Sequence, residues 1–213
     1  MGRTILVVGA TALALAAVPA AAAPPTLTLK ATPAIVTYGG ATALSGTLTP
    51  AKVNQKVGIS SQDCGQGAFK TQANVKTTAT GGYTASQSPT MNENYQAKSG
   101  KTTSPTISVK VAPLVDLKVT GGAVFRGFNA TVTAAQTFNG KYVVFQRRNA
   151  RKHKWVTIKK VTLTTQTNGK PPTIVTSKAF TVRIIGHPLT RLILPAAQAG
   201  TCYLPAKSKA VKS

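Results

Sequence analysis

The middle of the chain reads Pro113-Leu114-Val115-Asp116-Leu117-Lys118-Val119-Thr120, with an apolar side chain at every second position from Val115. Alternation of this period predicts a β-strand with one face buried and the other in water. A proline directly before such a strand makes a short, stiff connection. The stretch therefore predicts a boundary at Pro113, with a new β unit beginning immediately after it.

The same alternation recurs along most of the chain, in short runs that end at Gly, Pro or Asn. Beyond residue 22 no segment has a sustained helical period. The expected strands cover residues 26–31, 41–48, 56–60, 69–77, 82–86, 93–98 and 104–111 in the first half, and 115–120, 129–135, 141–147, 155–164, 179–185, 190–194 and 207–211 in the second. Short strands with turn signals about every 8–12 residues are typical of a β-sandwich. We therefore predict an all-β protein with two tandem sandwich domains, residues 24–112 and 114–213.

The two halves also resemble each other in sequence. The alignment pairs residues 57–59 with 143–145, Phe69 with Trp155, Tyr83 with Phe180, Tyr95 with Leu192, and Ser104 with Ser208. Its spacing requires insertions in the second half, at residues 165–176 and 195–202. Loops accept insertions more readily than strands do. We therefore expect loops at both places and a repeated fold.

Several runs resemble the repeating signature of bacterial immunoglobulin-like domains in secreted and surface proteins. They are residues 36–40, 44–48, 81–84 and 94–97 in the first half, and 144–148, 154–156 and 203–208 in the second. The second half lacks the Gly-Gly-aromatic turn of the first. The resemblance implies two tandem immunoglobulin-like β-sandwich domains that serve as a spacer, an adhesin or a binding module, usually without chemistry.

The N-terminal segment has the parts of a secretory signal peptide. Arg3 supplies a positive charge, residues 5–18 form an apolar run, and residues 20–23 are alanines. The run is shorter than the ~20 residues that span a bilayer. We predict cleavage after Ala22, so that residues 1–22 are a signal peptide and the rest is secreted or at the cell surface. An uncleaved anchor is the alternative, although no basic cluster follows the run.

Charge is strongly unbalanced along the chain. It has 26 Lys and Arg residues against three Asp and Glu, a formal net charge of +23 at pH 7. Such a surplus favours association with anionic partners, and wall polymers, nucleic acid and lipid headgroups all fit. The solubility of an exported protein explains the surplus equally well, so the sequence leaves both interpretations open.

Groups that can transfer protons are scarce. Beyond residue 22 the carboxylates and imidazoles are Asp63, Glu93, Asp116, His153 and His187. General acid–base catalysis and glycoside hydrolysis need such groups within reach of one another, and metal ions need clustered ligands. We therefore predict no catalytic residue, no metal and no cofactor. A hydrolase with one of the histidines beside a nucleophile is the alternative, although the sequence has no Gly-x-Ser-x-Gly motif.

The densest chemical feature is residues 147–154, which lie between two expected strands. Arginine can grip phosphate or carboxylate with two hydrogen bonds, and Trp155 beside the run could stack on a sugar or base. We predict a polyanion-binding site made of Arg147, Arg148, Arg151, Lys152, Lys154, Lys159 and Lys160. The alternative is a solvated hairpin tip. For Trp155 we favour a core position, as for the corresponding Phe69.

The two cysteines, Cys64 and Cys202, suit a single disulfide in an exported protein and do not suit a zinc site. Because successive strands alternate in direction, the loops that hold them both face the junction of the two domains. If residues 195–202 lean back, the two Cα atoms can come within about 5.5 Å and the bond would join the domains. Unpaired or intermolecular cysteines are the alternative. The same alternation sends residues 148–154 to the far end of the second domain.

These features favour an exported, non-catalytic module that contacts polyanionic cell-surface or extracellular material through the basic loop of the second domain. The alternative is a purely structural spacer, or a module that contacts another protein of the cell envelope. The sequence does not determine the ligand, the oligomeric state or any anchoring to the envelope.

Overall fold

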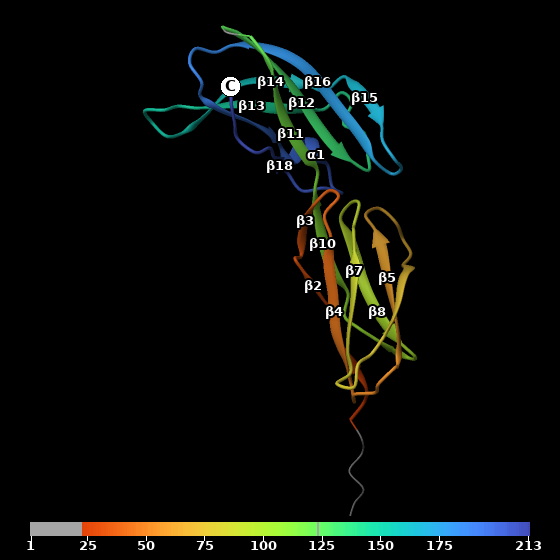
Figure 1. The fold of residues 1–213 in the computed structure, drawn as a ribbon. Helices are drawn as coiled ribbons and strands as arrows, with labels where there is room; N and C mark the ends of the chain where they lie inside the picture. The colour runs from red at the N-terminus through yellow and green to blue at the C-terminus, as the bar shows by residue number, and fades with distance from the viewer. Residues whose placement is uncertain (1–22, 123) are drawn as a thin grey trace, which may run out of the picture.

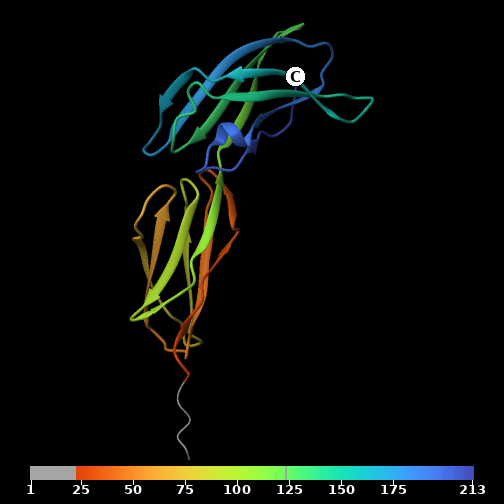
Figure 2. The same ribbon diagram turned by 180° about the vertical axis from the view of Figure 1, so that it is seen from behind.

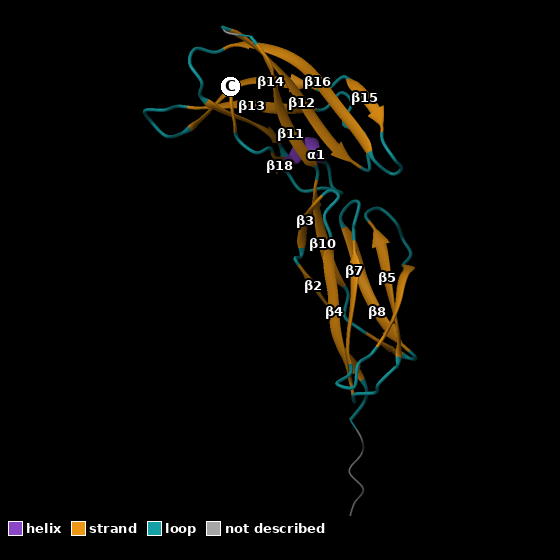
Figure 3. Cartoon of the chain, viewed as in Figure 1, coloured by secondary structure: helices purple, strands orange, loops and turns teal. Residues whose placement is uncertain are grey.

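The computed structural model describes residues 23–122 and 124–213, so the predicted signal peptide, residues 1–22, lies outside the described part. The described chain is all-β, with one short helix, α1 (Ala196–Ala199) (Figure 3). Its strands form four sheets, two before Pro113 and two after it. Figures 1 and 2 show an N-terminal lobe, residues 23–112, with a C-terminal lobe, residues 114–213, lying across its end.

The N-terminal lobe is a pair of facing sheets. In the first, β4 (Thr42–Thr49) pairs with β1 (Thr26–Leu27), β2 (Lys30–Thr32) and β7 (Gly82–Gln87). The second has the order β3 (Ile35–Thr37), β10 (Ile107–Ala112), β8 (Glu93–Ser99), β5 (Lys56–Asp63) and β6 (Lys70–Lys76), with β9 (Thr102–Thr103) beside β8. The pair β3–β10 is parallel, and the other pairs of this lobe are antiparallel.

The C-terminal lobe repeats this plan. Its first sheet has the order β11 (Leu114–Gly121), β12 (Phe125–Ala134), β16 (Ile174–Arg183) and β15 (Thr165–Asn168). Its second has the order β14 (Trp155–Thr162), β13 (Tyr142–Arg148), β17 (Leu189–Leu194) and β18 (Ala206–Lys207), with β19 (Val211–Lys212) also on β17. Only Pro113 separates β10 from β11, as its position before an alternating strand predicts.

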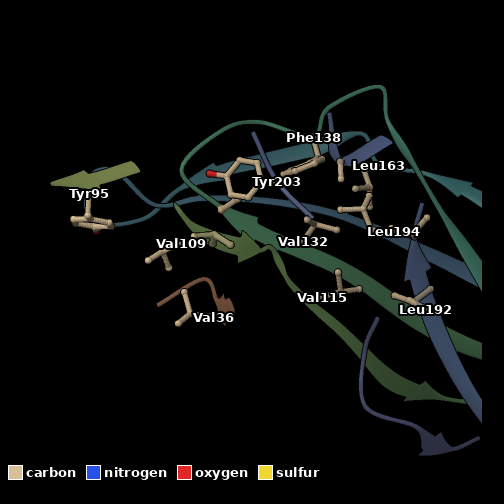
Figure 4. Packing of buried hydrophobic residues seen from close by; sticks show 14 of the residues in the cluster. Val36, Tyr95, Val109, Val115, Val132, Phe138, Leu163, Leu192, Leu194 and Tyr203 are labelled. Carbon is tan, nitrogen blue, oxygen red and sulfur yellow. The ribbon is translucent and has the colours of Figure 1, made fainter. Parts of the chain in front are cut away.

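Alternating burial along the strands builds the core. In β12 every second side chain is buried. In β13 the alternate residues Val143 and Phe145 are buried in the same way. Rings from the two sheets meet in the middle of the lobe, where the centroid of Phe128 lies 4.8 Å from that of Phe145 and 5.5 Å from that of Phe180. The buried apolar residues of both lobes form one contiguous cluster that crosses the junction, where Tyr203 lies beside Phe138 (Figure 4).

Close packing between the strands of the N-terminal lobe explains the glycine in the 44–48 run. Gly46 of β4 pairs with Tyr83 of β7, and the Tyr83 hydroxyl donates a hydrogen bond to the carbonyl oxygen of Thr28. A Cβ atom at position 46 would collide with that carbonyl oxygen and with the Tyr83 ring. Only glycine fits here without movement of the backbone.

We expect Gly46→Ala to lower the free energy of unfolding by about 3 kcal/mol, because overpacking shifts the backbone of a packed sheet. Gly67→Ala is the matched control, since a Cβ atom there meets nothing within 4 Å. The control should change stability by less than about 0.5 kcal/mol. Urea denaturation measures both, and equal stability of the two variants would contradict the close approach at Gly46.

The internal repeat is visible in the strand registers. In the N-terminal lobe Ile59 pairs with Ala97, and the β5–β6 pairing has a bulge directly after Ile59. In the C-terminal lobe Phe145 pairs with Leu192, and the β13–β14 pairing has a bulge directly after Phe145. The registers therefore agree with the alignment of residues 57–59 with 143–145.

Two serines extend the match and correct one pairing. The Ser104 hydroxyl accepts a hydrogen bond from the N–H of Ala97, and the Ser208 hydroxyl accepts one from the N–H of Leu192, each at 2.9 Å. The alignment of Ser104 with Ser208 therefore holds. The alignment of Tyr95 with Leu192 is wrong by two residues, because the counterpart of Leu192 is Ala97. Sequence similarity missed this because an aromatic and an aliphatic side chain suit a core position equally well.

Several stretches differ from the expected strands, among them residues 26–31 and 207–211, each of which forms two short strands. Residues 165–176, expected as a loop, form β15 and the start of β16, joined by a tight turn in which the Gly169 N–H donates to the Thr173 carbonyl oxygen at 2.9 Å. The inserted residues thus lengthen a hairpin, and the threonines among them favour the strand conformation. Residues 195–202 contain α1. β3 is absent from the expected strands, because three residues are too few for periodicity to register.

Candidate functional site

The basic run forms the turn of a β-hairpin. Residues 149–154 join β13 to β14, and the Asn149 N–H donates to the Lys154 carbonyl oxygen at 2.8 Å. The side-chain oxygen of Asn149 accepts from the N–H groups of Arg151 and Lys152, both at 3.0 Å. The hairpin projects from the C-terminal lobe at its far end, away from the N-terminal lobe (Figures 1 and 2). Asn149 therefore fixes the backbone from which the charged side chains extend.

Four of the seven predicted binding residues lie at this tip with exposed side chains. They are Arg148, Arg151, Lys152 and Lys154, called the tip cations below. The sequence contains no Asp or Glu after Asp116, and Asp116 lies on β11 near the junction. The hairpin turn thus has no acidic side chain of its own, and its arginines are free to form bidentate hydrogen bonds with an external anion.

The other three predicted residues lie further back along the hairpin, and the seven do not form one surface. Arg147 is half-buried and, by alternation, shares the face of β13 that carries Phe145. Lys159 pairs with Phe145 and shares that face as well. Lys160 lies on the opposite face of β14, with its Nζ atom 4.8 Å from the centroid of the Tyr142 ring. Because adjacent side chains of a strand point to opposite faces, Lys159 and Lys160 could not share one surface, and grouping the cations by sequence proximity overlooked this.

Trp155 is not a core residue, and the expectation from the sequence is wrong here. The indole is half-buried and covered by the guanidinium of Arg191, whose Cζ atom lies 4.0 Å from the ring centroid. Nε of Arg191 donates to the side-chain oxygen of Gln146 at 3.0 Å, and burial lowers the pKa of Arg191. The reason is register, since Trp155 pairs with the exposed Arg148 on the outer face of the sheet. The corresponding Phe69 is also partly exposed, at 37%.

One acidic side chain near the junction, that of Glu93, has structural partners. Asp63 and Glu93 are neighbours across β5 and β8. The Glu93 carboxylate accepts hydrogen bonds from the Thr90 N–H at 3.0 Å and the Tyr95 hydroxyl at 2.7 Å. Burial, and then this hydrogen bond, raise the pKa of Tyr95. Glu93 therefore stabilises the end of β8.

The two histidines lie apart from these carboxylates. His153 is exposed in the hairpin turn, and Nδ1 of His187 lies 2.8 Å from the carbonyl oxygen of Ser213. In the part of the chain that the structure describes, no three His, Cys, Asp or Glu side chains are close enough together to hold a metal ion.

Cys64 and Cys202 form a disulfide between the lobes, which confirms the pairing predicted from strand direction. Their Cα atoms lie 5.4 Å apart and the bond spans 138 positions of sequence. Residues 195–202 lean onto the N-terminal lobe, as the pairing required. A disulfide indicates an oxidising environment outside the cytosol.

Asn92 connects the two lobes beside this disulfide, and sequence reasoning missed it. Its N–H and its side-chain amide donate to the carbonyl oxygens of Cys202 and Thr201, at 2.9 and 3.1 Å. Its side-chain oxygen accepts from the N–H of Val111 at 2.8 Å, and its own carbonyl oxygen accepts from the N–H of Cys64 at 2.9 Å. One buried side chain thus fixes a loop of each lobe.

Tyr203 completes the junction. Its hydroxyl donates to the Thr90 carbonyl oxygen at 2.8 Å and accepts from the Ala135 N–H at 3.0 Å, so it contacts both lobes. Its side chain is 3% exposed. Chiefly because of this burial, the pKa of Tyr203 is raised to about 12.

We expect Tyr203 to make stability depend on pH above 10. Its hydroxyl ionises near pH 10.0 in the unfolded chain and near pH 12 in the folded one, so its contribution is complete below pH 10 and is lost as pH rises toward 12. Tyr203→Phe should therefore be less stable than the unmodified protein by about 1 kcal/mol at pH 9, and the gap should shrink at pH 11.5. Urea denaturation at both pH values measures it, and a constant gap would contradict the assignment.

No family model matches this chain, and a search of curated proteins gives no match. α1 has four residues, and none of the helical structure described here is long and apolar enough to cross a membrane.

Proposed function

We propose that this protein is an exported, non-catalytic binding module that contacts polyanionic cell-surface or extracellular material through the tip cations. In this proposal residues 1–22 are a cleaved signal peptide. The disulfide supports export, because such bonds persist in oxidising compartments. The shortage of carboxylates and imidazoles, and the structural partners of Glu93, support a role without catalysis.

We further propose that residues 24–112 and 114–213 are two tandem domains of the immunoglobulin-like type. The strand order supports this assignment. Each lobe packs two mainly antiparallel sheets, and the strands of the C-terminal lobe have the same spatial order as their counterparts in the N-terminal lobe. In the N-terminal lobe, the parallel pair β3–β10 joins the N-terminal segment to the last strand. Such sandwiches place loops at their two ends, where binding residues commonly lie.

The observation that carries the binding proposal is the exposed tip of the hairpin. Four cations extend from a turn held by Asn149, and the chain offers no acidic side chain after Asp116 to neutralise them. A flexible polyanion such as a wall polymer would exchange its counterions for these side chains on binding. Affinity should then depend on salt more than on the sequence or shape of the polymer.

Binding to long-chain inorganic polyphosphate tests this function. If the four tip cations each neutralise one phosphate, raising NaCl from about 50 to 200 mM should weaken binding about 50-fold. Fluorescence anisotropy of labelled polyphosphate measures the affinity, with uncharged dextran as the control ligand. An affinity that is unchanged by salt, or equal binding to dextran, would overturn the proposal.

The alternative function is a rigid spacer or protein-interaction module of the cell envelope. The specific observation in its favour is the junction, where a disulfide and the hydrogen bonds of Asn92 and Tyr203 hold the lobes together. A spacer would have a stoichiometric protein partner that resists high salt. Recovery of such a partner from the envelope, together with no binding to polyphosphate, would favour this alternative.

A further inference from the structure

Exposed apolar side chains lie at the same end of the C-terminal lobe as the tip cations. Because strand direction alternates, the turns β11–β12, β13–β14 and β16–β17 share this end. Figure 1 shows all three on the side of the lobe that is remote from the junction. Val124 is 49% exposed, Phe125 is 67% exposed and Ile185 is 78% exposed. The turns that carry them touch, because the Ile184 N–H donates to the Val124 carbonyl oxygen at 3.0 Å.

The backbone holds this apolar tip in place. Gly122 has φ +92, and a Cβ atom there would collide with the carbonyl oxygen of Phe125, so the turn before Phe125 accepts only glycine. Nη2 of the buried Arg126 donates to the Gly186 carbonyl oxygen at 3.0 Å and ties the second turn to the first. Phe125 and Ile185 therefore project from a connected pair of turns.

Exposed cations lie at the same end of the lobe as these side chains. Besides the tip cations, this end of the lobe carries the exposed Arg183, which pairs with Phe125, and the exposed Lys212, which pairs with the first residue of β17. The chain has no acidic side chain beyond Asp116 to balance them. Exposed aromatic and aliphatic side chains that share one end of a lobe with Lys and Arg complement a surface with an apolar interior and anionic headgroups.

We propose that the far end of the C-terminal lobe docks on an anionic lipid surface, with Phe125 and Ile185 entering the headgroup region and the cations at this end binding lipid phosphates. This inference rests on the proposed polyanion binding and names its partner. A soluble polyanion would satisfy the cations and leave Ile185 in water, whereas a lipid interface buries the apolar side chains as well.

Vesicle binding by the disulfide-bonded protein tests the proposal. Vesicles of phosphatidylcholine and phosphatidylglycerol at 7:3 should bind the protein at least ten times more tightly than pure phosphatidylcholine. Phe125→Ser with Ile185→Ser should weaken binding to the anionic vesicles about ten-fold or more and leave polyphosphate binding unchanged. The matched control is Ile35→Ser with Val53→Ser. It removes two exposed apolar side chains from the N-terminal lobe, each 60% exposed. The control should bind vesicles as the unmodified protein does.

A depth measurement gives a second readout. In a Trp155→Phe background, Phe125→Trp leaves one tryptophan at the apolar tip, because the chain has a single Trp. Its fluorescence should shift to the blue and be quenched by brominated lipid in anionic vesicles.

The outcomes separate the two proposals. If polyphosphate binds but vesicles do not, or if the Phe125 and Ile185 variant binds vesicles unchanged, the lipid inference fails and the polyanion function stands. Loss of polyphosphate and vesicle binding together in that variant also overturns the lipid inference. If the unmodified protein binds neither ligand, both proposals fail.

Discussion

Removal of the Cys64–Cys202 disulfide should lower the free energy of unfolding by about 4–5 kcal/mol. The bond closes a loop of 138 positions, and cross-linking residues so far apart removes much of the conformational entropy of the unfolded chain. The effect should be measured by guanidinium denaturation of Cys64→Ala with Cys202→Ala against the oxidised protein. Loss on this scale is a large part of the stability of a typical domain.

The reduced unmodified protein is the control for the double variant, since it lacks the bond and retains both sulfur atoms. It should lose nearly the same stability. Asn92→Ala in the oxidised protein separates the hydrogen bonds from the covalent link, and should cost about 2 kcal/mol by leaving buried partners unsatisfied. If reduction lowers the free energy of unfolding by less than about 1 kcal/mol, the bond does not substantially restrict the unfolded chain.

Replacement of the four tip cations by serine should weaken polyphosphate binding about 100-fold or more. Each cation near an anionic surface contributes about 1 kcal/mol, and the contributions add when the side chains are separate and exposed. The unfolding free energy should change by less than about 1 kcal/mol, because exposed charges without partners contribute little to stability. Fluorescence anisotropy in about 0.1 M salt, where the Debye length is about 10 Å, measures the binding.

A charge-matched control distinguishes the tip from the net charge of the protein. Its four replaced lysines, Lys30, Lys52, Lys76 and Lys101, are exposed on the N-terminal lobe. The control removes the same formal charge and should reduce affinity less than about five-fold, since charges beyond a Debye length are screened. Equal losses in both variants would assign the binding to overall charge instead of the hairpin.

Strand periodicity and strand direction were enough to predict much of this fold. The alternation in residues 113–120 predicted β11 and its start directly after Pro113, because one face of the strand is buried. Alternating strand direction placed Cys64 and Cys202 on the same junction, and the structure joins them. These predictions succeeded because each depends on local pattern and chain order.

Other features depend on register and on distant partners, which the sequence does not display. Trp155 lies on the outer face because of its pairing with Arg148, and its partner Arg191 comes from β17. Asn92 carries no sequence signal of its role, since an asparagine before a strand resembles an ordinary turn residue. The face on which Lys159 lies likewise follows from its pairing with Phe145 in the β13–β14 register.

The most direct test of the binding site is an NMR titration of the ¹⁵N-labelled protein with short-chain polyphosphate at low salt. Binding at the tip cations predicts the largest amide shifts in residues 148–154, smaller shifts in the neighbouring turns at the same end of the lobe, and none in the N-terminal lobe. Shifts spread evenly over the lysines of both lobes, or confined to the N-terminal lobe, would contradict a hairpin binding site.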